Sequence, residues 1–354
     1  MATIEDASNR QWTLGLYQRY THVQFHKVEQ EDQARKLYNN AWNSSKVLLQ
    51  NDKLVMCATA SWDVHGVGVA TLLGQIATNT STDIRQELAN GALPFVPPQR
   101  SIAKQIAMKA VLTTLCKRKT VEYFGSAPYR YKSLCYYDVD QHAGVRGHVA
   151  LTIDDAPCRF PDRESSELPR LLELLKVHDA KATFMTIGSW CTGQHRKDLI
   201  SLLQEGHELG NHGMMDRSYE FDSAQDFGAA VDECSAVIEE LQSASSVNVG
   251  VRWFRAPHAR YTEEMAQGLS SKGLTNVMCD TYASCPIVQD GNFIAKHLSE
   301  RCQDGSIILL HMPEIHVRQW CWDGLVGLLR GLKERDFKVV TVSELSRLAA
   351  EKQE

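Results

Sequence analysis

The stretch His148–Cys158, with the sequence H-V-A-L-T-I-D-D-A-P-C, decides the fold. Its residues Val149–Ile153 have the apolar character of a buried strand, and the two acids Asp154 and Asp155 follow at the strand's end, before a proline. Side chains alternate between the two faces of a strand, so we expect the two carboxylates to leave it in different directions. One carboxylate could then bind a metal ion while the other accepts a proton, which indicates metal-assisted hydrolysis.

Apolar segments of strand character recur after this stretch and alternate with amphipathic segments of helical spacing. The predicted strands are Val149–Ile153, Ala182–Ile187, Glu208–Asn211, Trp253–Ala256, Asn276–Asp280, Ile307–His311 and Lys338–Val342. The predicted helices are Glu167–His178, Arg196–Glu205, Ala224–Leu241, Glu263–Lys272, Phe293–Cys302, Trp322–Glu334 and Ser343–Ala350. This order predicts an α/β fold with a parallel sheet, and about seven strand–helix units indicate a distorted (β/α) barrel, with an open sheet as the alternative.

The first 145 residues differ in character and contain no chemical motif. Glu29–Leu49 and Ser101–Cys116 have the charge and apolar spacing of helices, whereas Leu54–Ala60 has that of a short strand. We therefore expect two parts. A mainly helical region of unknown role covers residues 1–145, and a catalytic domain covers residues 146–354.

The bulk composition is that of an ordinary globular protein, with 43% hydrophobic and 23% charged residues and a formal net charge of −5. Lys and Arg are not in surplus, so we expect no nucleic-acid partner, and no apolar run is long enough to predict a membrane span. The polar start Met1–Arg10 lacks a secretory signal, so we expect a cytoplasmic protein, with secretion only if the true amino terminus differs. The ten cysteines are irregularly spaced, and reduced thiols are therefore expected.

Polar residues stand at the carboxy-terminal ends of five predicted strands, where the sites of parallel barrels lie. They are Asp154, Asp155, His212, Arg255, Asp280 and His311. His212 and Asp216 would share a face of a helical turn, and with Asp155 they make a donor set that suits zinc or another divalent ion. Taken alone, that pair is better explained as a helix start and a solvated charge. Arg255 would keep a neighbouring carboxylate ionised, and His311, whose imidazole titrates near neutrality, could act as a general acid.

Five segments resemble, in order and spacing, the motifs of the polysaccharide deacetylases, carbohydrate esterase family four. The resemblance spans about residues 147–345, and its segments are Thr152–Pro157, Ala182–Gly188, Gly206–His212, Phe254–Pro257 and Ile307–His311. The first of them reads T-I-D-D-A-P, whereas the family motif is T-F-D-D-G-P. The resemblance implies Asp154 as the general base, oriented by Arg255, and His311 as the general acid. It also implies Asp155 and His212 as ligands of a divalent metal, Zn²⁺ in the first place, with Co²⁺ or another ion as alternatives.

Several positions depart from the family pattern. Asp216 stands where the family usually has a second histidine ligand, and we expect it to be the third ligand here. Asp280 fits the first aspartate of the family's fourth motif, whereas Cys285 stands at the second. His258 follows the Arg-x-Pro segment, where an aromatic residue is common. We assign substrate contacts to five residues around these positions and on the last strand and helix: Asp280, Pro257, His258, Leu309 and Trp322.

The resemblance implies a metal-dependent hydrolase that removes acetyl groups from N-acetylated amino sugars, as in chitin-type or related oligo- and polysaccharides. Two alternatives stay open. A hydrolase of the same fold could act on a small linear or cyclic amide, as the allantoinase-like members do, and the altered pocket favours this alternative. The other is a non-catalytic, metal-containing carbohydrate-binding protein, although mere binding needs neither a base nor an acid. A homo-oligomer is compatible with the sequence.

Overall fold

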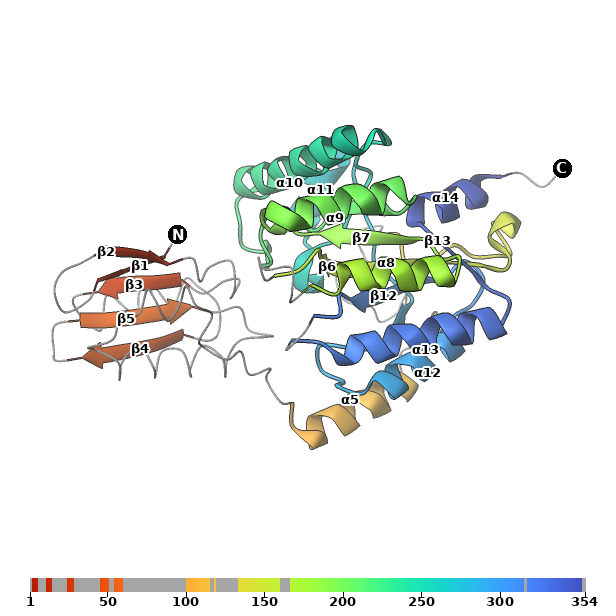
Figure 1. The fold of residues 1–354 in the computed structure, drawn as a ribbon, viewed down its shortest axis with the longest axis horizontal. Helices are drawn as coiled ribbons and strands as arrows, with labels where there is room; N and C mark the ends of the chain where they lie inside the picture. The colour runs from red at the N-terminus through yellow and green to blue at the C-terminus, as the bar shows by residue number, and fades with distance from the viewer. Residues whose placement is uncertain are drawn as a thin grey trace. The chain divides into compact units, whose positions relative to one another are not determined.

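The computed structural model divides the chain into two compact units, Met1–Gln99 and Arg100–Glu354 (Figure 1). In the first unit it describes the backbone of five strands. In the second it describes residues 100–114, 118, 133–159, 166–314 and 317–351.

The elements described in the first unit are strands. They are β1 (Ala2–Glu5), β2 (Gln11–Leu14), β3 (Gln24–Val28), β4 (Ser45–Gln50) and β5 (Leu54–Thr59). β1 pairs with β2, and β5 lies between β3 and β4, in each case antiparallel. The strand predicted at Leu54–Ala60 is confirmed. The mainly helical character predicted here is wrong for the described part, because β4 covers the end of the expected helix Glu29–Leu49, the rest of which lies outside the described residues. Pairing with β5, which local spacing does not reveal, decides the conformation of β4.

The second unit begins well before residue 145, where we expected the boundary. Helix α5 (Ile102–Thr114) forms where the sequence predicted a helix, and it belongs to this unit. Its Lys109 pairs with Asp290 at 2.6 Å between Nζ and Oδ2. Farther along, Nε of Arg118 donates to Oδ2 of Asp280, whose side chain is buried, at 2.6 Å. Ion pairs with distant residues therefore fasten this segment to the barrel.

Shortening the chain tests this boundary. A fragment of residues 100–354 keeps the bond between Arg118 and Asp280, and we expect it to unfold in one cooperative transition. A fragment of residues 146–354 leaves Asp280 buried without its guanidinium, which should cost about 3 kcal/mol of unfolding free energy. Urea denaturation of both fragments measures the difference, and equal stabilities would contradict the role of Arg118.

The second unit is built on a parallel sheet. Its strands are β6 (His148–Ala156), β7 (Ala182–Thr186), β8 (Glu208–Asn211), β9 (Trp253–Phe254), β10 (Thr275–Asn276), β11 (Thr281–Tyr282), β12 (Ile307–His311) and β13 (Lys338–Val340). Their order is β10-β9-β8-β7-β6-β12-β11, and β13 pairs with the start of β6.

The sheet is curled because its two end strands are neighbours in sequence. Only Val277–Asp280 separate β10 from β11, and this connection spans at most about 18 Å. Seven flat strands about 4.8 Å apart would place the two ends about 29 Å from each other. The distorted (β/α) barrel predicted from the sequence is thus confirmed. The predicted strand Asn276–Asp280 is wrong, since β10 ends at Asn276 and Asp280 precedes β11.

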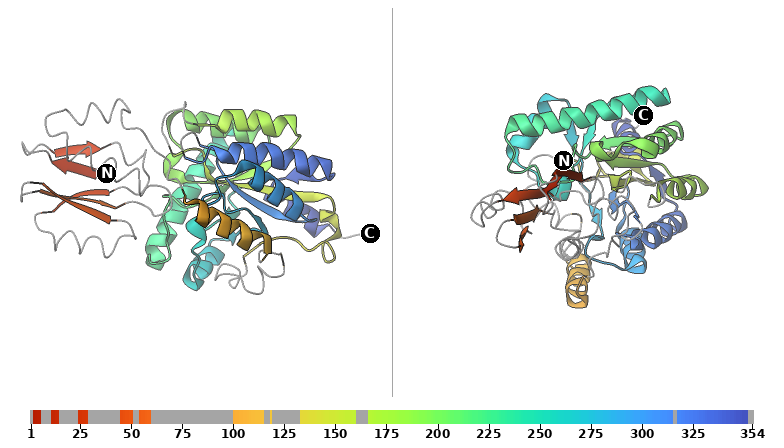
Figure 2. Two further views of the ribbon diagram at one scale, coloured as in Figure 1. Left: turned by 90° about the horizontal axis from the view of Figure 1, so that it is seen from below. Right: turned by 60° about the vertical axis from the view of Figure 1, so that its left-hand side comes forward.

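Helices surround the sheet (Figures 1 and 2). They are α8 (Leu168–Val177), α9 (Gly193–Gln204), α10 (Ala224–Ser245), α11 (Glu263–Ser271), α12 (Gly291–Arg301), α13 (Trp320–Glu334) and α14 (Val342–Ala350), with 3₁₀ turns η1 (Ala143–Val145), η3 (Gly188–Trp190) and η4 (Pro257–Ala259). In α8, for example, Leu168, Leu171, Leu172 and Leu175 form a buried apolar stripe at helical spacing. Among the described helices, none combines the length and hydrophobicity that crossing a bilayer requires.

His207 makes the stability of this unit sensitive to acid. The residue is 4% exposed, and its Nδ1 accepts a hydrogen bond from the amide of Ala182 at 3.2 Å. Burial, assisted by the charge of Lys181, lowers the pKa of His207 to about 4. Between its ordinary pKa of about 6.5 and this value, the unfolded chain binds a proton that the folded protein does not. The unfolding free energy should therefore fall by about 3 kcal/mol from pH 6.5 to pH 4 and gain nothing above pH 6.5.

Urea denaturation at several pH values measures this dependence. His207→Gln should lose it, whereas His148→Gln, at the partly exposed start of β6, should keep it. The same dependence in both variants would show that another group is responsible.

Candidate active site

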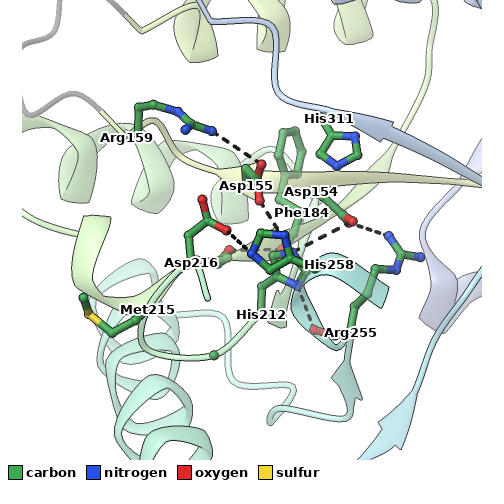
Figure 3. Close-up of polar contacts among 12 residues, drawn as sticks. Asp154, Asp155, Arg159, Phe184, His212, Met215, Asp216, Arg255, His258 and His311 are labelled. Atoms are coloured by element: carbon green, nitrogen blue, oxygen red, sulfur yellow. Dashed lines mark hydrogen bonds and ion pairs between the residues drawn. The ribbon is translucent and has the colours of Figure 1, made fainter. Parts of the chain in front are cut away.

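The two acids at the end of β6 face the same imidazole. A β-bulge shifts the register of β6 against β7 between Asp154 and Ala156, and Asp155 has a left-handed backbone with a φ of 62°. Nε2 of His212 consequently lies 3.9 Å from Oδ2 of Asp154 and 3.5 Å from Oδ1 of Asp155 (Figure 3). The other oxygens of the two carboxylates have different partners, Arg255 for Asp154 and Arg318 for Asp155, and the expectation that the carboxylates leave the strand in different directions stays a prediction.

Arg255, which follows β9, holds Asp154 in place. Its Nη1 donates to Oδ1 of Asp154 at 2.5 Å and to Oγ1 of Thr152 at 2.8 Å. Nε and Nη2 donate to the carbonyl oxygens of Val277 and Met278 at 2.7 and 2.9 Å. Because the backbone fixes this buried guanidinium, Arg255 sets the position of the carboxylate. The predicted contact is present, and the role of Asp154 as a base stays a prediction.

A backbone carbonyl orients His212. Nδ1 donates to the carbonyl oxygen of Arg255 at 2.7 Å, so in the neutral ring the lone pair of Nε2 faces the acids. Two ligands of a tetrahedral ion with bonds of about 2.1 Å are about 3.4 Å apart. The 3.5 Å between Nε2 of His212 and Oδ1 of Asp155 therefore fits a shared metal ion.

The loop after β8 positions Asp216. The helical turn predicted from His212 to Asp216 is absent, because Tyr219 holds this segment in another conformation. The hydroxyl of Tyr219 accepts a hydrogen bond from the amide of Met215 at 2.8 Å and donates to its carbonyl oxygen at 2.9 Å. Gly213 packs so closely on this ring that a Cβ there would lie 2.7 Å from it. The ring of Tyr219 therefore fixes the loop that carries Asp216.

Asp216 lies against His258, which we had expected at the substrate. Oδ1 of Asp216 is 3.5 Å from Nε2 of His258. Burial and the charge of Asp155 raise the pKa of Asp216, so the two carboxylates repel each other, and a divalent cation would relieve this repulsion. The donor chemistry thus fits a metal. However, no three His, Cys, Asp or Glu side chains in the described part of the chain form a ready ligand sphere. Ligation by Asp155, His212 and Asp216 stays a prediction.

A buried network of charges around Asp155 was missed by the sequence analysis. Nη1 of Arg318 lies 2.6 Å from Oδ2 of Asp155, and its Nη2 donates to Glu314 at 2.9 Å. Arg159 donates from Nε to the same Glu314 at 2.9 Å and places Nη2 3.6 Å from Asp155. Burial alone would raise the pKa of Asp155, but the charge of Arg318 and a hydrogen bond with His212 hold it well below its ordinary value. The one feature of the sequence that could have indicated this network is the separation of four residues between Glu314 and Arg318, which is typical of an ion pair.

His311 ends β12 directly beside Asp154. The two residues are partners in the parallel register, so the predicted acid and base terminate neighbouring strands. Nδ1 of His311 lies 3.0 Å from Sγ of Cys285. Burial alone would lower the pKa of His311, but the charge of Cys285, the hydrogen bond with it and the charge of Asp155 together raise it. The imidazole is therefore suited to carry a proton near neutrality.

Comparison with known proteins agrees with this geometry. Residues 142–277 match the family model for polysaccharide deacetylases. Residues 142–277 belong to the polysaccharide deacetylase family. A bifunctional xylanase/deacetylase from Pseudobutyrivibrio xylanivorans is 25% identical over 197 residues, which are 56% of this chain and 30% of the relative. A peptidoglycan-N-acetylglucosamine deacetylase from Listeria monocytogenes is 27% identical over 205 residues, 57% of this chain and 40% of the relative. The chain thus spans less than half the length of these relatives.

A solved structure supports the fold of the second unit. The Xyl-CE4 domain of a multidomain xylanase from the hindgut metagenome of Trinervitermes trinervoides is 26% identical, with a TM-score of 0.50. The match covers 57% of this chain and 90% of that domain.

Asp280 lies away from Asp154 and Asp155. Its carboxylate accepts hydrogen bonds from Arg118, Ser306 and the amide of Ile307, the first residue of β12. It therefore sits at the end of β12 opposite to His311. The predicted placement at the substrate is wrong, because Asp280 precedes β11 and does not end a strand.

Three other residues expected at the substrate are buried or covered by another side chain. Leu309 is 7% exposed in a core cluster, and Pro257 is buried. The ring of Trp322 is covered by the guanidinium of Arg170, 3.7 Å from its centroid, so a sugar would have to compete with that contact. Substrate binding by these residues stays a prediction.

Proposed function

We propose that this protein is a metal-dependent hydrolase that removes acetyl groups from N-acetylated amino sugars. The observation that carries the proposal is the ion pair of Asp154 with Arg255 beside the paired Asp155 and His212, with His311 at the end of the neighbouring strand. Membership of the polysaccharide deacetylase family supports the class of reaction.

Three side chains would hold a divalent cation, with Zn²⁺ first and Co²⁺ as an alternative: Asp155, His212 and Asp216. Such an ion polarises a carbonyl group and lowers the pKa of a bound water. Asp155 would bind through Oδ1, because Oδ2 is engaged by Arg318. The second carboxylate brings a negative charge that a histidine would not, and the nearby charges of His258, Arg159 and Arg318 act against the rise in its pKa.

Asp154 and His311 would move the protons. Arg255 occupies Oδ1 of Asp154, so Oδ2 is left to take the proton of the attacking water. The water oxygen adds to the acetyl carbon, and the carbon–nitrogen bond then breaks. His311 gives its proton to the leaving nitrogen, so that acetate and a free amine are produced.

Acetate release from N-acetylglucosamine tetramers tests the proposal. Purified full-length protein is stripped with EDTA and reloaded with Zn²⁺ or Co²⁺, and bound metal is measured by elemental analysis. We expect release only after reloading. His212→Gln should lose both metal and activity, whereas His148→Gln should keep both.

The alternatives give other outcomes. Turnover of small amides such as allantoin without acetate release would favour the allantoinase-like hydrolase, which the departures at Asp216, His258 and Cys285 make the stronger rival. Metal binding without any hydrolysis would favour a carbohydrate-binding protein. An unchanged metal content in His212→Gln would refute the ligand assignment.

A further inference from the structure

Cys285 occupies the position in which His311 needs a partner. A histidine that transfers a proton through Nε2 requires a fixed group on Nδ1, which sets the tautomer and the orientation of the ring. Here the sulfur of Cys285 lies 3.0 Å from Nδ1, and the residue is 0% exposed. Cys285 is thus in direct contact with the proposed general acid and shielded from solvent.

The loop that carries Cys285 is held rigidly. Nε1 of Trp320, at the start of α13, donates to the carbonyl oxygen of Cys285 at 2.8 Å. The amides of Ile287 and Val288 both donate to the carbonyl oxygen of Ser284 at 2.8 Å, and Ser284 has a φ of 51°. Because these bonds fix the backbone on both sides, the sulfur cannot leave the imidazole without disrupting the turn.

The surrounding charges favour an ion pair. Burial alone would raise the pKa of Cys285, but a hydrogen bond with Cys321 and the charges of His311 and Arg318 hold it well below its ordinary value. Cys285 in turn raises the pKa of His311. Both directions correspond to a thiolate beside an imidazolium.

We propose that Cys285 is the positioning residue of His311: its sulfur accepts the hydrogen bond from Nδ1, and Nε2 carries the proton that the leaving amine takes. This inference rests on the proposed function. Cys285 forms no bond with the substrate, and an anionic carboxylate could perform the same task. A nucleophilic cysteine is the competing explanation, because a thiol beside an imidazole also occurs in acyl transfer.

Two substitutions separate these explanations in the full-length, metal-loaded protein. Cys285→Ala should lower kcat for acetate release by about 10²–10⁴-fold with KM little changed, because the acid loses its orientation. Cys285→Asp should restore most of the rate, since a carboxylate accepts the same hydrogen bond. Cys302→Ala, at an equally buried thiol elsewhere in the core, is the matched control and should retain wild-type kinetics. A folded Cys285→Asp that is as slow as Cys285→Ala would overturn the proposal.

Nitrogen-15 NMR of the histidine side chains provides a readout that needs no substrate. The His311 signal is assigned by its loss in His311→Gln. We expect both ring nitrogens to be protonated in the wild-type protein at pH 7. An unprotonated Nδ1 in the wild-type protein would overturn the proposal even if no Cys285 variant folds. If the wild-type protein releases no acetate but shows this protonation, the proposed function fails while the pairing of Cys285 with His311 stands.

Discussion

Asp154→Asn is expected to lower kcat for acetate release by about 10²–10⁴-fold without loss of the fold. The amide oxygen can still accept the hydrogen bond that Arg255 donates at 2.5 Å, but it cannot take a proton from water. Initial rates and bound metal are measured on the same preparation, and the metal content should stay at the wild-type level.

Asp280→Asn is the matched control for this experiment. Asp280 is also a buried aspartate paired with an arginine, but it lies at the opposite end of the strands. We expect it to lower stability while kcat stays near the wild-type value. A wild-type rate in Asp154→Asn would show that another group acts as the base.

Glu314→Ala is expected to lower the unfolding free energy by about 3–5 kcal/mol. Glu314 is 0% exposed and accepts hydrogen bonds from the amide and side chain of Arg159 and from Arg318. Its removal leaves two buried guanidiniums with Asp155 as their shared counterion. Urea denaturation at pH 7 measures the loss.

The exposed pair of Glu344 and Arg347 provides the comparison for Glu314. Both pairs join a glutamate to an arginine three or four residues later in the chain, but water surrounds the exposed pair. Glu344→Ala should therefore change stability little. A similar small effect of Glu314→Ala would mean that water compensates the buried arginines.

Local sequence pattern predicted those elements whose conformation depends on near neighbours. The strand Ile307–His311 forms with the predicted bounds, because a continuous apolar run suits a strand covered on both faces. Where the observed elements differ from the predicted ones, contacts between distant segments determine the conformation. β4 is a strand because β5 lies beside it, and Asp280 leaves the predicted strand because Arg118 and Ser306 bind its carboxylate.

The same distinction applies to the candidate site. Because the carboxy-terminal ends of parallel strands meet, the sequence could bring Asp154, His212, Arg255 and His311 together. It could not show that Arg159 and Arg318 share a buried glutamate, since charged side chains are usually solvated and their partners lie far away in the chain. The contact of Cys285 with His311 was equally hidden, because it joins the loop after β11 to the end of β12.

The left-handed backbone of Asp155 decides which substitutions can report on its charge. At a φ of 62°, asparagine is tolerated, whereas alanine adds about 1–2 kcal/mol of backbone strain. Alanine scanning at this position would therefore mix the loss of a carboxylate with relaxation of the bulge, and that relaxation would also displace Asp154. Asp155→Asn removes the charge and keeps the shape. In a mutational library, tolerance at position 155 should follow the ability to adopt this conformation as well as the ability to bind a cation.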